Sequence, residues 1–124
     1  MRPESDDWEL VRDLEDRLKK AGALEPTAEE VSSVRRAAAQ VGLSDDEVGS
    51  ILGTQDGFAR LVIEVRRRIR EGSQRMMRAF TRAQQLLEEG DSQGARAVFE
   101  AVLTEEPVPY YRETVEEQMR TFGL

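Results

Sequence analysis

One apolar stripe with the period of an α-helix runs through residues 55–89. At 100° per residue, its members fall within about 40° of one line. They are Phe58, Val62, Val65, Ile69, Gly72, Met76, Phe80, Ala83 and Leu87. A loop near Gly72 would reset this phase, and the phase is unchanged there. The stripe therefore predicts one long helix with Gly72 on its buried face, where a kink is also compatible with the pattern. The competing interpretation is two helices that break at Gly72, with Ser73 as the second N-cap.

Start and stop signals divide the rest of the chain into five further helices. Thr27 with Glu30, and Ser44 with Glu47, match the capping-box pattern. Glycines and prolines follow the apolar runs, as is typical of helix ends. The predicted ranges are 5–21, 28–41, 45–52, 94–104 and 110–122. The expected fold is an all-α, compact bundle of about six helices around the long central helix, in a single domain over residues 1–124.

The composition excludes much enzyme chemistry. The 124 residues include no cysteine and no histidine, so thiolate catalysis and serine–histidine catalysis cannot occur. The densest acidic clusters, Asp6-Asp7 and Asp45-Asp46-Glu47, lie at predicted helix starts, where capping and the helix dipole account for them. We therefore expect a protein that is not an enzyme, with no catalytic, cofactor-binding or metal-binding residues.

The chain shows no sign of membrane insertion or export. The segment from Met1 to Leu10 is acidic and polar, and no run approaches the ~20 apolar residues of a membrane span. The expectation is a cytoplasmic protein that does not bind a membrane.

Positive charge is concentrated in residues 60–82, which we call the arginine band. It holds eight arginines and two glutamates, whereas the segments on both sides are acidic and the whole chain has a net charge of −7. The band could bind phosphate, nucleic acid or an acidic protein. The favoured alternative is that acidic helices pack around it and neutralise much of it. A pI near 4.8 argues against a nucleic-acid partner.

Helical projection sorts the arginine band into two groups. Arg66, Arg68, Arg70 and Arg75 flank the apolar stripe, so adjacent helices can reach them and we expect several to pair with carboxylates. The outward group consists of Arg60, Arg67, Arg78 and Arg82. With Tyr110 and Tyr111, which could anchor an interface, this group is the predicted docking site for an acidic partner protein. The alternative for the tyrosines is that one of them packs against the preceding hairpin and the other is exposed.

Several phrases together resemble the DUSAM domain, a family of small paralogous myxobacterial proteins. They are Trp8, Arg67-Arg68-Ile69-Arg70-Glu71-Gly72-Ser73, Gly90-Asp91 with Gly94-Ala95-Arg96, and Val108-Pro109 with Tyr111-Arg112-Glu113. The resemblance spans nearly the whole chain and implies a helical, cytoplasmic bacterial protein. It implies no activity, and no site residue follows from it.

Two other resemblances cover short segments. Residues 79–107 resemble one tetratricopeptide unit through Ala95, Phe99 and Pro107, although a solenoid needs about three such units. The spacing of residues 38–51 resembles a helix-turn-helix. Its second helix begins with three acidic residues and contains no lysine or arginine, which opposes DNA binding.

The leading functional hypothesis is a noncatalytic protein–protein interaction module, acting as an adaptor or regulator in the bacterial cytoplasm. One alternative is an immunity-type or antitoxin-type inhibitor, because small acidic proteins in paralogous sets fit that role. A further alternative is a nucleic-acid-binding regulator that uses the arginine band. The partner would be another protein, and a homo-oligomer is compatible with the sequence.

Overall fold

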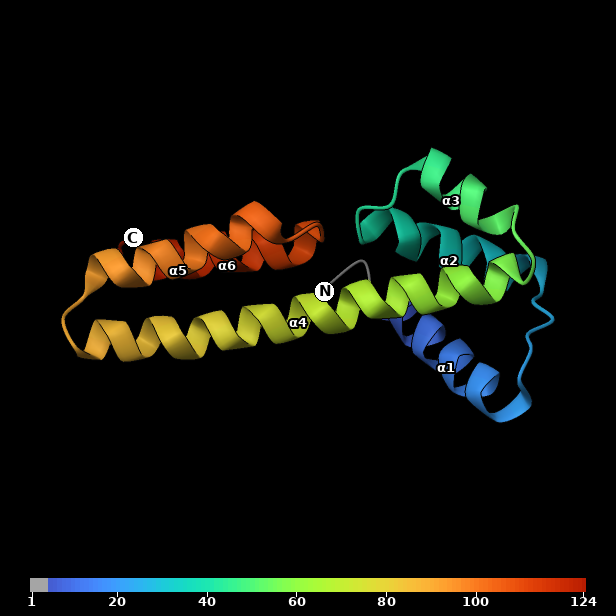
Figure 1. Ribbon diagram of the computed structural model, residues 1–124, viewed down its shortest axis with the longest axis horizontal. Helices are drawn as coiled ribbons and strands as arrows, with labels where there is room; N and C mark the ends of the chain where they lie inside the picture. The colour runs from blue at the N-terminus through green and yellow to red at the C-terminus, as the bar shows by residue number, and fades with distance from the viewer. Residues whose placement is uncertain (1–4) are drawn as a thin grey trace. The chain divides into compact units, whose positions relative to one another are not determined.

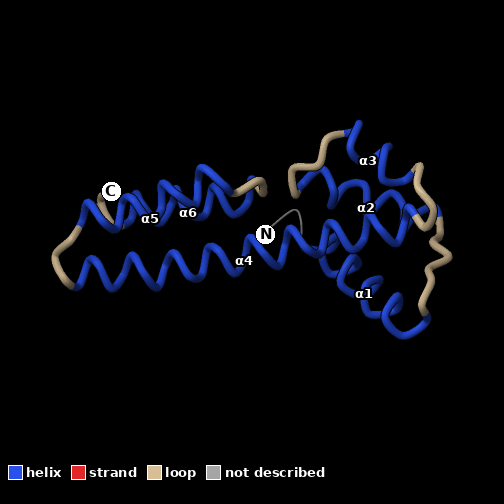
Figure 2. Tube along the Cα trace, in the orientation of Figure 1, coloured by secondary structure: helices blue, strands red, loops and turns tan. Residues whose placement is uncertain are grey.

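The computed structural model describes residues 5–124, and every regular element in that range is an α-helix (Figure 1). The predicted all-α class is confirmed, and the predicted boundaries agree with the observed ones to within two residues. The helices are α1 (Ser5–Ala21), α2 (Ala28–Gln40), α3 (Asp45–Leu52), α4 (Gly57–Glu88), α5 (Ser92–Glu105) and α6 (Pro109–Thr121). Short turns and loops join them (Figure 2).

Side chains satisfy the free amides at the starts of α2 and α3. The hydroxyl of Thr27 accepts from the Glu30 amide at 3.1 Å, and the Glu30 carboxylate accepts from the Thr27 amide at 3.0 Å. Ser44 and Glu47 repeat this reciprocal arrangement at the start of α3. Both predicted capping boxes are confirmed, so local sequence alone sets these two helix starts.

The helix α4 is unbroken from Gly57 to Glu88, which confirms the continuous interpretation over a break at Gly72. It begins two residues later than predicted because Asp56 has a left-handed backbone, with a φ of 57°. Gly57 then passes close to the end of α3, where an added Cβ would lie 2.5 Å from the Leu52 carbonyl oxygen. Only glycine fits this approach without a shift of the backbone.

The helix α5 begins at Ser92, earlier than predicted, because Asp91 is its N-cap. The Asp91 carboxylate accepts from the Gly94 amide at 2.8 Å. An added Cβ on Gly94 would collide with that carboxylate. The glycine that the sequence places at the helix start therefore lies inside the first turn, where it leaves room for the cap.

The described residues form two compact units, each with a core of its own. The N-terminal unit ends at Ile69 and contains α1, α2, α3 and the first part of α4. Its buried apolar residues are Val11, Leu14, Val34, Ala37, Ala38, Val41, Leu43, Val48, Leu61, Val62, Val65 and Ile69. The C-terminal unit begins at Arg70 and contains the rest of α4 with α5 and α6.

The core of the C-terminal unit is centred on Phe99, which is fully buried. Its ring meets Phe80 edge-to-face at a centroid distance of 5.9 Å and stacks on Phe122 at 6.4 Å. Side chains from α4, α5 and α6 complete the cluster. The other buried members are Ala79, Ala83, Leu86, Ala95, Val102 and Val115. The small alanines allow the helices of this unit to pack closely.

Candidate functional site

The predicted docking residues occupy different environments. The four outward arginines are all exposed, as the projection predicts. Tyr110 is half-buried, whereas Tyr111 is only 5% exposed. Tyr111 is therefore buried against α4 and is removed from the docking set, because its ring lies over the space that Gly72 leaves on α4.

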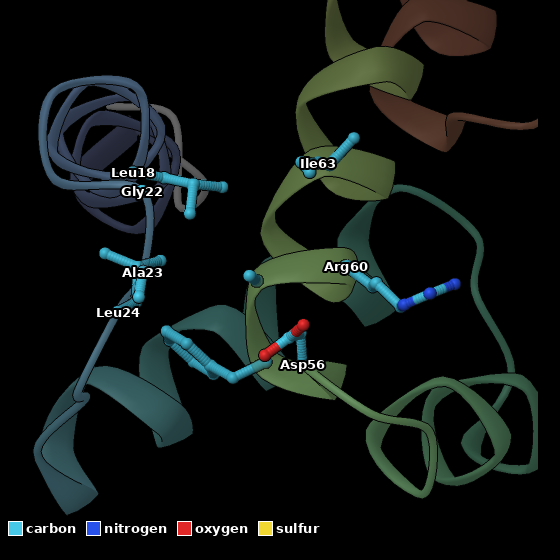
Figure 3. Close-up of a pocket in the computed structure, with 9 residues that line it drawn as sticks. Leu18, Gly22, Ala23, Leu24, Asp56, Arg60 and Ile63 are labelled. Atoms are coloured by element: carbon cyan, nitrogen blue, oxygen red, sulfur yellow. The ribbon is translucent and has the colours of Figure 1, made fainter.

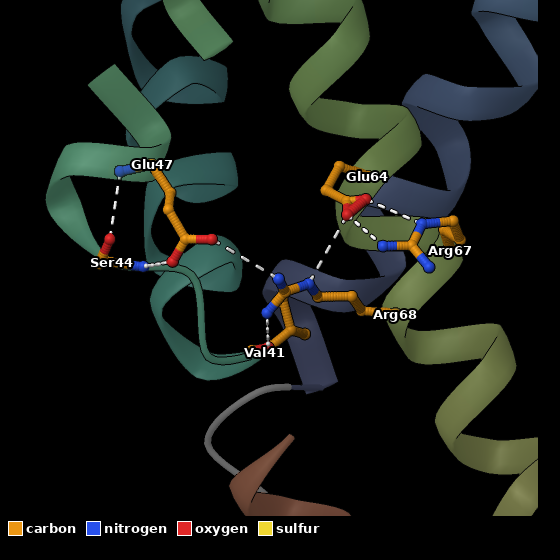
Figure 4. Close-up of polar contacts among 6 residues, drawn as sticks. All are labelled: Val41, Ser44, Glu47, Glu64, Arg67 and Arg68. Carbon is orange, nitrogen blue, oxygen red and sulfur yellow. Dashed lines mark hydrogen bonds and ion pairs between the residues drawn. The ribbon is translucent and has the colours of Figure 1, made fainter. Parts of the chain in front are cut away.

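Arg68 connects three parts of the N-terminal unit (Figure 4). Its guanidinium donates to the Val41 carbonyl at 3.1 Å and lies 3.7 Å from the Glu64 carboxylate and 3.8 Å from the Glu47 carboxylate. The carbonyl of Val41 belongs to the C-terminal end of α2, where a cation also opposes the negative end of the helix dipole. Arg68 thus holds α4 against α2 and α3, and its positive charge is balanced by carboxylates of the N-terminal unit itself.

The two outward arginines of the N-terminal unit also have partners. Arg67 forms an ion pair with Glu64 one turn earlier on α4 (Figure 4). The hydrogen bond from Arg67 lowers the pKa of the Glu64 carboxyl below its ordinary value. Arg60 donates from Nε to the Gln55 carbonyl at 2.9 Å. Both guanidinium groups face solvent, but their donors are partly satisfied by the chain itself.

Flanking arginines pair with carboxylates on neighbouring helices, as predicted. Arg66 contacts Glu15 of α1 at 3.2 Å, and Arg75 contacts Glu106, which follows α5, at 2.7 Å. The second pair differs from the exposed pairs expected, because Glu106 is only 2% exposed. The other oxygen of Glu106 accepts from the Val108 amide at 3.0 Å. This carboxylate therefore organises the connection between α5 and α6.

Gly72 lies beneath this connection. An added Cβ there would lie 2.5 Å from the Tyr111 ring and 3.0 Å from the Glu106 carboxylate. Arg112 donates to the carbonyls of Leu103 and Glu106, which holds the start of α6 beside the end of α5. The prediction that Gly72 lies on the buried face is confirmed, and α6 is the element that approaches it.

The remaining outward arginines, Arg78 and Arg82, border a shallow hollow of about 290 Å³ in the C-terminal unit, which we call the α4–α5 groove. Its lining residues are Arg75, Arg78, Ala79 and Arg82 from α4 and Val98, Ala101, Val102 and Glu105 from α5. Within residues 5–124, neither Arg78 nor Arg82 makes a hydrogen bond or an ion pair. The groove therefore combines an apolar floor with two free cations one helical turn apart.

The α5 wall of this groove was not predicted. Val98 is half-buried, packs against the core around Phe99 and also lines the groove, where Ala101 is exposed. Residues three apart lie on the same side of a helix. That spacing is the signal that could have indicated a second apolar strip along the side of α5.

A second hollow, of about 490 Å³, lies in the N-terminal unit between the end of α1 and the start of α4 (Figure 3). Leu18, Phe58 and Ile63 contribute apolar surface, and Ile63 is 49% exposed. Asp56 and Arg60 contribute one charge of each sign. Because the two charges oppose each other, the lining does not select an anionic or a cationic ligand.

Two kinds of site are absent from the part of the chain that the structure describes. No three carboxylate, histidine or cysteine side chains come together there in a group that could hold a metal ion. In the same residues, no helix combines the length and the apolar character needed to cross a bilayer.

Removal of divalent metal is expected to leave the stability unchanged, because helix capping and apolar packing account for both cores. Thermal unfolding followed by circular dichroism should give the same midpoint with and without a chelator. A midpoint several degrees lower in chelator would contradict this prediction and would indicate a structural metal.

These features define an all-α protein with two helical cores and a basic groove between two helices of the second. A family model matches residues 6–122, and the chain belongs to this family, DUF2379, which is described as a protein of unknown function. The search of curated proteins and the search of solved structures each found no match. The family match includes residues of all six helices, so it covers the groove, but it supplies no activity.

Proposed function

We propose that this chain is a noncatalytic protein–protein interaction module, an adaptor or regulator that binds an acidic partner protein through Arg78 and Arg82. One observation carries the proposal: these two arginines are exposed and have no partner among residues 5–124, whereas Arg66, Arg68 and Arg75 are paired with carboxylates of the chain. The apolar floor beside them supplies the contact area that exposed ion pairs alone lack.

The pairing within the arginine band favours a protein partner over a nucleic acid. Only two of its eight arginines lack a contact within the described residues, and tight binding to DNA typically requires several phosphate contacts. The net charge of −7 also repels a polyanion. A short acidic surface on a protein requires only a local match, which two neighbouring guanidinium groups can provide.

The proposal includes the cellular context that the DUSAM resemblance implies, namely the bacterial cytoplasm. The hairpin of α4 and α5 is the segment that resembles a tetratricopeptide unit, and it carries the groove. An immunity-type or antitoxin-type inhibitor would use the same kind of contact, with a toxin as the acidic partner. The identity of the captured protein distinguishes an adaptor from an inhibitor.

Charge reversal at the groove is expected to abolish partner capture. The double variant Arg78→Glu/Arg82→Glu replaces both free cations, and it should reduce the captured partner by about tenfold or more because attraction becomes repulsion. The outward residue Arg67 is left unchanged in this variant, because it is already paired with Glu64. Affinity capture from native lysate with quantitative mass spectrometry measures the effect.

The matched control is Arg12→Glu/Arg35→Glu, which makes the same change of charge at two exposed arginines of the N-terminal unit. Neither residue has a hydrogen bond or ion pair within residues 5–124. The control should capture the same proteins as the wild type, and circular dichroism should show both variants folded. Equal capture by the groove variant and the wild type would refute the proposed function.

A further inference from the structure

We infer that the partner docks through an amphipathic α-helix that lies along the α4–α5 groove, with two carboxylates one turn apart facing Arg78 and Arg82. This inference rests on the proposed function and adds the form of the partner. It follows from the shape of the groove, from the side chains on its floor, and from the unequal charges on its two walls.

The shape of the groove favours a helical partner. Its walls are α4 and α5, which run side by side in the C-terminal unit (Figure 1). An extended peptide usually binds by adding to a sheet edge, and residues 5–124 contain no strand. A polyproline peptide usually needs an aromatic-lined groove, and none of the lining residues here is aromatic. A helix laid between two helices is the recognition mode that remains.

The floor of the groove is suited to close helix packing. Ala79, Val98, Ala101 and Val102 are small or β-branched, so they leave a depression rather than a ridge. Helices pack at axial distances of about 8–10 Å when the contact side chains are small. A fourth helix in this position would cover Ala101, which is exposed, and Val98, which is half-buried.

The charges specify which side of the partner helix is acidic. Arg78 and Arg82 are four residues apart, so they rise by about 6 Å along α4. Glutamates at positions i and i+4 of a partner helix have the same rise and can face both arginines. The opposite wall carries Glu105, whose carboxylate lies 3.8 Å from Nε of Arg75 and whose side chain is still 72% exposed to solvent. A carboxylate on that side of the partner would be repelled, so the acidic residues must lie on the α4 side only.

Three fluorescein-labelled peptides of about five helical turns test this inference with the full chain. The first has leucines at helical spacing and glutamates at i and i+4 on one side of the leucine face. The second has lysines in place of those glutamates. The third has the residues of the first in an order that removes the amphipathic pattern. Fluorescence anisotropy should show the first binding about tenfold more tightly than the second and the third.

Two alanine variants test whether the floor takes part. Ala101→Glu places a charge where the apolar face of the peptide would lie, and it should weaken binding of the first peptide by about tenfold. Ala39→Glu makes the same change at an exposed position of α2, and it should leave binding unchanged. Both sites are exposed alanines within helices, so both variants should fold.

The outcomes separate the inference from the proposed function. If the first and third peptides bind equally, or if Ala101→Glu has no effect, the helical docking mode is wrong. The proposed function would still stand if Arg78→Glu/Arg82→Glu abolishes partner capture. If that variant captures the same partner as the wild type, the groove is not the interaction site and both are wrong.

Discussion

Replacing Arg75 with methionine is expected to lower the free energy of unfolding by about 3 kcal/mol. Its guanidinium is 2.7 Å from the carboxylate of Glu106, whose side chain is fully shielded from solvent. Without Arg75, that carboxylate keeps the Val108 amide as a donor but loses its only close cation among the described residues. A buried charge left in this state costs much more than the pair contributes when it is intact. Urea denaturation measures the change.

The matched control is Arg96→Met, which removes an ion pair with Glu100 whose two side chains are 60% and 58% exposed. Water replaces the lost partner there, so the cost should be no more than about 1 kcal/mol. The double variant Arg75→Met/Glu106→Gln should recover much of the lost stability, because a neutral amide no longer needs a cation. Equal effects of Arg75→Met and Arg96→Met would show that Glu106 is not buried as described.

Much of the fold could be predicted because its signals are local. The capping boxes at Thr27 and Ser44 depend on residues three positions away, and the apolar stripe through Gly72 depends only on the helical period. The errors arose where a boundary depends on backbone conformation. Asp56 adopts a left-handed conformation, so α4 begins later in the chain than predicted. The Asp91 carboxylate caps α5, so that helix begins earlier than predicted.

The candidate site was predicted only in part, for a physical reason. Helical projection identifies which arginines face outward, but the choice of partner depends on tertiary structure. Arg75 and Glu106 are 31 positions apart, so no local pattern connects them. Tyr110 and Tyr111 are adjacent and chemically identical, and Tyr111 is the one that shares a face of α6 with the buried Val115, four residues later, and that fills the space above Gly72. Predicting the groove would also have required knowing that α5 packs beside α4.

Several residues of the phrases that carry the DUSAM resemblance have structural explanations within the C-terminal unit. Gly72 leaves room for Tyr111, and Gly94 leaves room for the Asp91 cap. Arg112 of α6 donates hydrogen bonds to the carbonyls of Leu103 and Glu106 at the end of α5. These residues therefore maintain the hairpin and its connection, while the groove that we propose as functional lies on exposed arginines outside those phrases.

Replacing Gly72 with leucine is expected to lower the free energy of unfolding by roughly 1–3 kcal/mol through overpacking. Even the first added atom would lie 2.5 Å from the Tyr111 ring, which is buried and cannot move aside without disturbing the start of α6. The same clash predicts that Gly72→Ala destabilises the protein, although alanine is a better helix former by about 1 kcal/mol. Chemical denaturation of both variants measures the effect.

Gly49 provides the matched control for Gly72, because it lies within α3 with nothing inside 4 Å of an added Cβ. Gly49→Ala should therefore stabilise the protein by up to about 1 kcal/mol, as helix propensity predicts when no clash opposes it. Removing the Tyr111 ring tests the cause directly. In a Tyr111→Ala background, Gly72→Leu should cost clearly less than it does in the wild type, since the added side chain then occupies the space that the ring vacates. If Gly72→Leu has the same cost with and without the ring, the clash with Tyr111 does not explain why glycine is needed at this point of α4.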